Sequence, residues 1–300
     1  MTPLRFGLVG TGHWAQIAHA PALAATAGIE LAAVWGRDLA RARRLAATHN
    51  AVAHEDLGSF LADVDAVAFA VPPDVQAPIA ERAANAGKHL LLEKPVALTD
   101  SAADALVNAV DRARVASVVF FTARFQPEVR GWLADVTARA GWLGGAAVLL
   151  GRNLESGPFN TPWRREKGAL WDVAPHVISL LWASLGPVTS VTADAGLADI
   201  THLILHHRSG VTSTATITLN APDPAAEFDL YLWGESGKSV LPARGDDPVA
   251  ALRTALTELA ANARSGQVSH PCDVRFGRDI GRVLADAQHQ LDSRAAGAAW

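Results

Sequence analysis

Short apolar runs alternate with helical patterns over the first 120 or so residues, and this alternation limits the possible folds more than any other feature. The runs are apolar almost throughout and have strand length: Leu4–Val9, Leu31–Trp35, Ala66–Val71, His89–Leu92 and Ser117–Phe121. Such runs suit strands covered on both faces, as in a parallel sheet. The helical patterns lie between them: Trp14–Ala25, Leu39–His49, Asp74–Ala86 and Ser101–Ala113. The alternation therefore predicts a doubly wound α/β sheet with right-handed crossovers.

The pattern changes after Arg124. A helix is expected near Pro127–Ala140, a strand near Ala146–Arg152 and, after an irregular stretch, an apolar helix near Leu170–Leu185. Four strand patterns separated by turn residues follow: Val188–Ala193, Thr201–His207, Val211–Leu219 and Phe228–Trp233. Consecutive strands joined by short turns predict a mainly antiparallel sheet. Two helices are expected at the end of the chain: Val249–Arg264 and Asp273–Arg294. We therefore expect an α/β domain over 1–122 and an α+β domain over 123–300.

Composition limits the class of protein. A chain of 300 residues that is 50% hydrophobic can form two cores. A net charge of −4 gives no basic surface for nucleic acid or anionic membranes. The most apolar windows have strand length, far below the roughly 20 residues that cross a bilayer. The first residues show no leader pattern, and the single cysteine, Cys272, favours a reducing compartment. We expect a cytoplasmic protein without nucleic-acid or membrane partners.

A glycine motif lies between the first expected strand and the first expected helix. In Gly10-x-Gly12-x-x-Ala15, the first glycine permits a tight turn and the second lets the backbone approach a pyrophosphate. The small Ala15 allows close packing of helix and strand, and the helix N-terminus offers N–H groups to phosphates. The alternative is a purely structural strand–helix turn. In this strand–helix–strand context the motif favours a dinucleotide site, with Thr11, His13 and Trp14 completing the cradle.

The choice of cofactor is read at the end of the second strand, about 20 residues beyond the glycines. An acid there would bind the ribose hydroxyls of NAD, but the sequence has Gly36 followed by Arg37 and Asp38, with further arginines at 41, 43 and 44. A guanidinium suits a 2′-phosphate, and no carboxylate at position 36 repels it. The alternative is that these arginines form a solvated helix face and that Asp38 caps the helix. We expect NADP to be preferred over NAD.

Along nearly its whole length the chain resembles the Gfo/Idh/MocA family, which includes glucose–fructose oxidoreductase and inositol dehydrogenase. Two pieces are specific: Glu93-Lys94-Pro95 at a strand end, and Leu170-x-Asp172-x-x-x-His176 in the second half. The other matching pieces are Gly10-Thr11-Gly12, His19-Ala20-Pro21-Ala22-Leu23, Val71-Pro72-Pro73-Asp74, Ala86-Gly87-Lys88-His89, Arg124-Phe125-Gln126-Pro127 and Pro162-Trp163-Arg164.

The resemblance implies a Rossmann domain followed by an open-faced antiparallel sheet like the C-terminal domain of glyceraldehyde-3-phosphate dehydrogenase. It implies hydride transfer between a nicotinamide and a hydroxyl-bearing carbon of a sugar, cyclitol or related polyol. The implied catalytic residues are Lys94, Asp172 and His176. Their chemistry agrees, because a histidine exchanges a proton near neutral pH and a lysine polarises the reacting oxygen. If the stretch is helical, Asp172 and His176 share one face.

Further site residues follow from the same resemblance. Expected cofactor contacts beyond the glycine cradle are Pro72, Glu93 and Lys94, in addition to Gly36 and Arg37. Expected substrate contacts, for hydroxyls, a carboxylate or a phosphate, are Arg124, Arg152, Asn153, Trp163 and Arg164. Each side chain also has an ordinary interpretation. Lys94 alone would be a surface cation, His176 a core histidine, Asp172 a helix cap, and the loop residues solvated. No metal is expected.

The chain departs from the family pattern at four places. It has Gln76 where the family often has histidine, and Ala123 where it often has asparagine. Ala174 replaces a common glycine, and Ser179 replaces a common acid. No proposed catalytic group is lost, but the departures weaken the assignment of a particular substrate.

Two other functions are compatible with this sequence. One is reduction of an imine or a tetrapyrrole bridge, and the other is a non-catalytic nucleotide or sugar sensor. Retention of Lys94, Asp172 and His176 favours C–O chemistry over both.

A homodimer or homotetramer is also expected, because both faces of the second sheet keep apolar side chains in the pattern: Leu203, Ile204, Leu205, Ile217 and Leu230. The threonine-rich run 212–218 argues against this.

Overall fold

The computed structural model describes residues 2–154, 157–243, 245 and 247–297. The chain forms two compact units, the first from residues 2–126 and 247–279 and the second from the described residues of 127–245 and 280–297. The expected division at residue 122 placed everything after it in one domain, whereas 247–279 belongs to the first unit. An amphipathic helix pattern does not reveal which of two cores the helix packs on, so the sequence did not predict this return.

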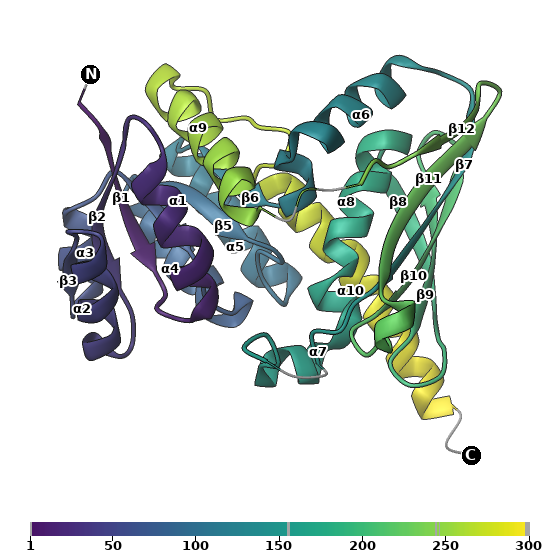
Figure 1. Ribbon diagram of the computed structural model, residues 1–300, viewed down its shortest axis with the longest axis horizontal. Coiled ribbons are helices and arrows are strands. Elements are labelled where there is room, and N and C mark those ends of the chain that lie inside the picture. Colours follow the sequence, from purple (N-terminus) through teal and green to yellow (C-terminus); the bar gives the residue numbers. More distant parts are fainter. Residues whose placement is uncertain (1, 155–156, 244, 246, 298–300) are drawn as a thin grey trace. The chain divides into compact units, whose positions relative to one another are not determined.

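The first unit contains a six-stranded parallel sheet with strand order β3-β2-β1-β4-β5-β6 (Figure 1). The strands are β1 (Leu4–Val9), β2 (Ile29–Trp35), β3 (Val52–His54), β4 (Ala66–Phe69), β5 (His89–Glu93) and β6 (Ser117–Phe120). β1 pairs with both β2 and β4, so the chain reverses its direction across the sheet at β1. In open α/β sheets this switch point, outside the carboxyl ends of the strands, is where ligands bind.

Helices connect these strands and cover the sheet. They are α1 (Ala20–Ala25), α2 (Leu39–Thr48), α3 (Leu57–Ala62), α4 (Pro73–Asn85) and α5 (Asp100–Ala113). α4 packs against α5, and α1 packs against α9 (Pro248–Ser265) from the far end of the chain. A π-helical turn at Ala15–His19 precedes α1, where the sequence predicted one continuous helix. Thr99 caps α5, since its hydroxyl accepts a hydrogen bond from the backbone N–H of Ala102 at 3.3 Å.

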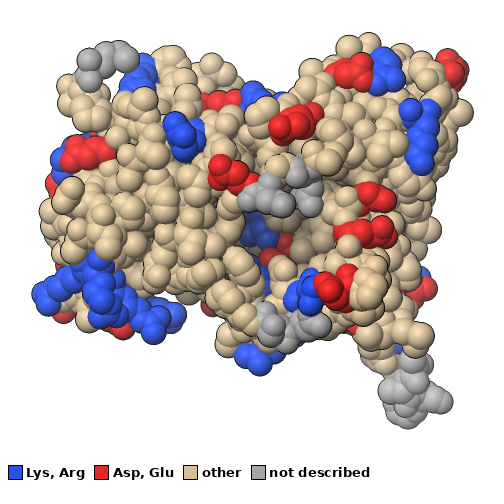
Figure 2. All heavy atoms as spheres, in the orientation of Figure 1, with Lys and Arg blue, Asp and Glu red and all other residues tan. Residues whose placement is uncertain are grey.

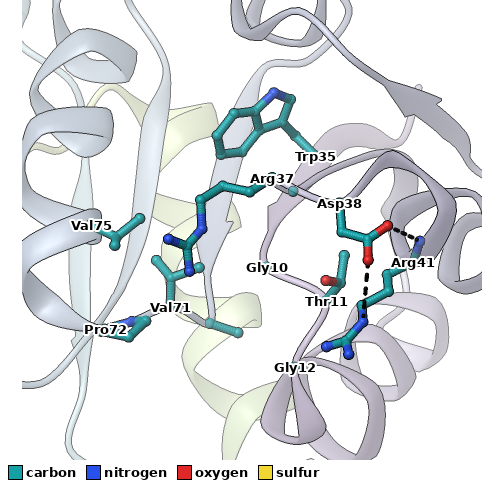
Figure 3. A pocket seen from close by; sticks show the side chains of 12 residues that line it. Gly10, Thr11, Gly12, Trp35, Arg37, Asp38, Arg41, Val71, Pro72 and Val75 are labelled. Atoms are coloured by element: carbon teal, nitrogen blue, oxygen red, sulfur yellow. Dashed lines mark hydrogen bonds and ion pairs between the residues drawn. The ribbon is translucent and has the colours of Figure 1, made fainter. Parts of the chain in front are cut away.

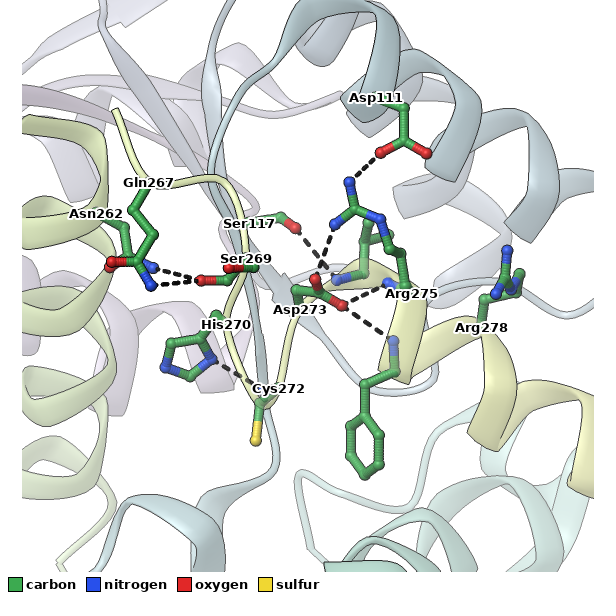
Figure 4. Close-up of polar contacts among 12 residues, drawn as sticks. Asp111, Ser117, Asn262, Gln267, Ser269, His270, Cys272, Asp273, Arg275 and Arg278 are labelled. Atoms are coloured by element: carbon green, nitrogen blue, oxygen red, sulfur yellow. Dashed lines mark hydrogen bonds and ion pairs between the residues drawn. The ribbon is translucent and has the colours of Figure 1, made fainter. Parts of the chain in front are cut away.

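The segment that follows α9 is hydrogen-bonded to β6 at the edge of the first sheet. Val119 donates its backbone N–H to the carbonyl of Cys272 at 2.6 Å. Val274 donates to the hydroxyl of Ser117 at 3.1 Å (Figure 4). Beside it, Arg275 bonds Asp273 and also reaches the carboxylate of Asp111 on α5. These contacts attach the segment and the first turn of α10 (Val274–Gly297) to the first unit.

The second unit contains a mixed sheet with strand order β12-β11-β7-β10-β9-β8. The strands are β7 (Trp142–Leu150), β8 (Val188–Ala195), β9 (Thr201–His207), β10 (Thr212–Thr218), β11 (Glu227–Gly234) and β12 (Gly237–Val240). Neighbouring strands pair antiparallel except β7 and β10, which are parallel. The long connection after β7, which contains α7 (Pro162–Asp172) and α8 (Ala174–Leu185), allows this parallel pair. α8 packs on β7 and β10, and α6 (Pro127–Ala138) packs on α8.

The two faces of this sheet differ more than the sequence pattern suggested. Leu203, Leu205, Ile217 and Leu230 are all buried, at 0–1% exposure, and the strand register places them on one face. Only Ile204 points the other way, where it is 41% exposed. The expectation that all five divide between two apolar faces was therefore wrong, because most of the apolar residues of the pattern face one core.

Candidate functional site

A pocket of about 430 Å³ lies at the switch point of the first sheet, above the carboxyl ends of β1, β2 and β4. Gly10 forms part of its lining with φ at +126°, a backbone conformation that suits glycine. A Cβ atom on Gly10 would lie 2.5 Å from the carbonyl oxygen of Ala70. Gly12 is exposed and a Cβ there would meet nothing within 4 Å, so the backbone is open to an approaching group. The glycine cradle thus fits a pyrophosphate.

Charged side chains occupy one wall of this pocket. Arg37 extends across it toward Val71 and Pro72, and Arg41 lies beside Asp38 and Gly12 (Figure 3). Asp38 caps α2 by accepting from the backbone N–H of Arg41 at 3.0 Å, and its second oxygen lies 3.4 Å from Nε of the same residue. The structural alternative for Asp38 is therefore correct. The carboxylate of Asp38 is occupied by Arg41, while the side chain of Arg37 reaches into the pocket.

The remaining arginines of α2 lie outside the pocket. Arg43 and Arg44 are exposed and are not among the residues that line the pocket. Basic side chains gather in the region of α2 (Figure 2), and this pair contributes to a solvated helix face. Gly36 lines the pocket as expected, and a Cβ there would lie 2.9 Å from Cγ2 of Thr11. An acid at position 36 would therefore require Thr11 to move.

The turn that carries Lys94 follows β5 and is attached to the segment after the cradle. One carboxylate oxygen of Glu93 accepts from the indole Nε1–H of Trp14 at 2.7 Å and lies 2.9 Å from Nε2 of His19. His19 is fully buried, and Glu93 is 14% exposed at its side chain. Trp14 directly precedes the π-helical turn that follows Gly12, and His19 is the last residue of that turn. Glu93 thus joins the end of β5 to the first turns after the phosphate cradle, while Lys94 next to it is half-buried.

In the second unit, Asp172 and His176 lie on either side of a helix junction. Asp172 is the last residue of α7, Val173 forms the junction, and His176 is in the first turn of α8. The single helix expected over Leu170–Leu185 is therefore wrong, and the condition for a shared helix face, one unbroken helix through both residues, is not met. Gly168, with φ at +65°, interrupts α7 just before this segment. Asp172 is buried and His176 is half-buried.

Side chains from α7 and from the loop before it converge on Asp172. Arg164 donates from Nε to the carboxylate at 2.8 Å, and Asn153 donates from Nδ2 to the same oxygen at 3.2 Å. The guanidinium of Arg164 lies 5.3 Å from the ring centroid of Trp163 and 5.4 Å from that of Phe159. A cation that stacks on two rings and pairs with a buried carboxylate is held in one orientation. Three of the expected substrate contacts are therefore grouped around Asp172.

The other expected substrate residues have separate surroundings. Arg152 pairs with the exposed carboxylate of Asp223. Arg124, in the first unit, lies over the ring of Phe276 at 5.6 Å. His13 is exposed next to the cradle and does not line the pocket. The sequence did not predict the contact of His19 with Glu93, the place of Trp35 in the pocket lining, the pairing of Arg41 with Asp38 or the contact of Phe159 with Arg164. His19 stood in a family segment, but nothing in its spacing predicted a bond to Glu93.

Two negative findings apply to the described residues alone. Within them, no group of three or more histidine, cysteine, aspartate or glutamate side chains is placed to hold a metal ion. None of the helices in the same part of the chain combines the length and apolar character needed to cross a membrane.

The strand order, the glycine cradle and the pocket at the switch point together define a Rossmann-type nucleotide-binding protein. Comparison with known proteins agrees: a family described as an oxidoreductase family with an NAD-binding Rossmann fold matches residues 4–121. A Gfo/Idh/MocA C-terminal domain matches residues 136–240. The chain belongs to the Gfo/Idh/MocA family of oxidoreductases.

Similar proteins include an inositol 2-dehydrogenase of Rhizobium meliloti, which is 30% identical over 263 residues. That match covers 82% of this chain and 77% of the relative. Two uncharacterized oxidoreductases, of Synechocystis and of Escherichia coli, are also 30% identical, over 65% and 64% of this chain. The chain spans only about half of their length, 55% and 56%.

Solved structures share the fold over nearly the whole chain. A putative myo-inositol dehydrogenase from Sinorhizobium meliloti has a TM-score of 0.83 at 21% identity, covering 97% of this chain and 98% of that one. GenD2 from gentamicin A biosynthesis, in complex with NAD, has a TM-score of 0.84 at 19% identity, covering 97% and 94%. At these identities the likeness shows the fold.

Proposed function

We propose that the protein is an NADP-preferring oxidoreductase that interconverts a secondary alcohol and a ketone on a sugar, cyclitol or related polyol. The observation that carries the proposal is the lysine turn at the end of β5, joined through Glu93 to the segment that follows the glycine cradle. The names of relatives support the substrate class, since they include an inositol 2-dehydrogenase, a levoglucosan dehydrogenase and a UDP-N-acetylglucosamine 3-dehydrogenase.

The proposed chemistry assigns one role to each of the three residues. The nicotinamide supplies or accepts the hydride when it is bound. His176 exchanges the proton of the reacting hydroxyl, because an imidazole titrates near neutral pH and serves both directions. Lys94 polarises the reacting oxygen with its ammonium group. Asp172 is already paired with Arg164 and acts as a fixed negative charge. Its carboxylate accepts a hydrogen bond from a substrate hydroxyl or holds His176 in its orientation.

The loop residues around Asp172 are the proposed substrate contacts. Asn153 and Arg164 present an amide and a guanidinium beside the carboxylate. Trp163 adds an aromatic surface on which the apolar face of a sugar ring can stack. Arg124 and Arg152 are proposed as further contacts for hydroxyl or anionic groups of the substrate, although Arg152 would first have to leave Asp223.

NADP binding is proposed to depend on Arg37. Arg37→Ala should weaken NADP binding by about 1–3 kcal/mol, the value of a charge-assisted hydrogen bond, and change NAD binding little. Arg44→Ala is the matched control, since Arg44 is exposed on α2 and does not line the pocket. Isothermal titration of both cofactors measures the effect. Tighter binding of NAD than of NADP by the wild-type protein would refute the preference, and equal losses for both cofactors would remove Arg37 from phosphate recognition.

A thermal-shift screen tests the function as a whole. Stabilisation by NADP, and less by NAD, is expected first, because a ligand that binds the folded state raises its melting temperature. Polyols, free sugars and sugar phosphates are then added with the better cofactor, and absorbance of the reduced nicotinamide reports turnover. Binding of the cofactor without turnover of any polyol or sugar would favour a nucleotide sensor.

A homodimer or homotetramer in the cytoplasm is proposed, with the exposed face of the second sheet as the interface. Its exposed apolar side chains are Ile204, Trp233 and Val240, at 41%, 40% and 53%. Threonines 212, 214 and 216 share the face, so an interface there would be mixed in polarity. Light scattering at micromolar concentration should give a multiple of 31.5 kDa. A mass equal to that of one chain would contradict the proposal.

A further inference from the structure

Gln76 is a fully buried amide that holds the backbone on both sides of Lys94. It lies in the first turns of α4, directly after the pocket residues Pro72 and Val75. Its Oε1 accepts from the backbone N–H of Glu93 at 2.8 Å. Its Nε2 donates to the carbonyl of Glu93 at 2.8 Å and lies 3.3 Å from the carbonyls of Pro95 and Val96. One side chain thus binds four backbone groups around the lysine.

Two different sets of contacts hold the turn that carries Lys94. Trp14 and His19 fix the carboxylate of Glu93, as described above. Gln76 fixes the peptide groups, and it does so for the residue before Lys94 and for the two residues after it. All of these groups belong to the first unit. The direction in which the Lys94 side chain leaves the backbone is therefore set by a contact from α4, the helix that begins at the pocket wall.

We infer that Gln76 is a positioning residue for Lys94: it orients the turn so that the ammonium group is presented in a fixed direction. The inference rests on the catalytic role of Lys94 in the proposed function. Misplacement of a reacting group by about 1 Å can cost roughly 100-fold in rate, so a buried amide that fixes the backbone has a measurable effect on turnover.

An amide suits this position better than the side chains most similar to it. Its oxygen satisfies one N–H while its two hydrogens serve the carbonyls. A glutamate of the same shape has no hydrogen to donate when ionised, and would face three carbonyl oxygens with a negative charge. A neutral histidine offers one donor and one acceptor, so it can keep the bonds to Glu93 N–H and one carbonyl at most. Glutamate at position 76 should therefore lose more of these hydrogen bonds than histidine does.

Gln76→Glu and Gln76→His test the inference in steady-state kinetics on the full chain. We expect Gln76→Glu to lower kcat by about 10- to 100-fold while the affinity for NADP changes by less than about 3-fold. Gln76→His should recover part of the lost kcat. Asp74→Asn, an exposed change in the first turn of the same helix, is the matched control and should leave kcat unchanged. A wild-type kcat for Gln76→Glu, beside a Lys94→Ala variant that has lost turnover, would overturn the positioning role alone.

A double mutant separates positioning from general damage to the fold. In a Lys94→Ala background, Gln76→Glu should change the residual rate by less than about 2-fold, because Gln76 acts through the lysine that is already absent. A further loss as large as in the wild-type background would show that Gln76 has a merely structural role and would overturn the inference. Full activity of Lys94→Ala itself would instead refute the proposed function. Because Gln76→His keeps part of the hydrogen bonding, it gives a result even if Gln76→Glu does not fold.

Discussion

Replacing Lys94 or His176 by alanine is expected to lower kcat by about 10²- to 10⁴-fold, the usual cost of losing a positioned acid–base or polarising group. NADP binding should survive both changes. The cradle, Arg37 and the pocket wall bind the cofactor phosphates and ribose in this proposal, and none of them is altered. Single-turnover kinetics on the true substrate and titration of NADP measure the two quantities separately.

Matched controls exist for both substitutions. Lys88 precedes β5, at the opposite end of the strand from Lys94, and its ammonium donates to the backbone carbonyl of Val64 at 2.8 Å. His206 is exposed on β9. Lys88→Ala and His206→Ala should keep kcat near the wild-type value. If the His176→Ala enzyme also kept a wild-type kcat, His176 would have no part in proton exchange.

The first sheet could be predicted from sequence because its strands are covered on both faces. Continuous apolar runs gave β1, β2, β4, β5 and β6 within a few residues, but β3 and α3 were missed. β3 has three residues, Val52–His54, none of them buried, so it shows neither an apolar run nor a clear alternation. The junction at Val173 was missed for a different reason. The stretch around it is largely apolar, interrupted by Asp172 and His176, and a run of that kind does not reveal where one helix ends and the next begins.

The pocket around the glycine motif could also be predicted from sequence, because short segments of the chain supply its residues. Gly10, Gly12, Gly36 and Arg37 all line one pocket, as the spacing of the glycine motif and the end of β2 predicted. The contacts around the proposed catalytic residues are not local. Glu93 meets Trp14 and His19 across 79 and 74 residues of chain. Such pairs depend on strand order and on a π-helical turn, and no short-range pattern carries that information.

Two arginines near α7 show the same limit. Arg152 in the loop before α7 and Arg164 in its first turn look alike in sequence, yet Arg152 pairs with the exposed Asp223 while Arg164 pairs with Asp172. The difference is one of burial, since the side chain of Asp172 is 3% exposed and that of Asp223 is 75% exposed. An exposed ion pair contributes about 0–1 kcal/mol, whereas a buried charge without its partner is strongly unfavourable. The two arginines therefore differ in what their removal should cost.

Arg164→Leu is expected to destabilise the second unit by about 3 kcal/mol, the lower end of the cost of breaking a buried ion pair, because Arg164 itself keeps 19% exposure. The change takes away the guanidinium that donates to the buried Asp172 carboxylate at 2.8 Å, while the contact from Asn153 is kept. It also removes the guanidinium from the rings of Phe159 and Trp163. Urea unfolding followed by tryptophan fluorescence measures the effect as a lower midpoint at unchanged slope.

Two companion variants identify the buried charge as the cause. Arg165→Leu changes the neighbouring exposed arginine and should alter stability by no more than about 0.5 kcal/mol. The double variant Arg164→Leu with Asp172→Leu removes both charges and should recover most of the stability, since no unpaired ion remains in the interior. If the double variant were as unstable as Arg164→Leu alone, the cost would come from lost packing against the aromatic rings. Asp172 would then not depend on Arg164 to remain buried, and its assignment as a fixed negative charge would be wrong.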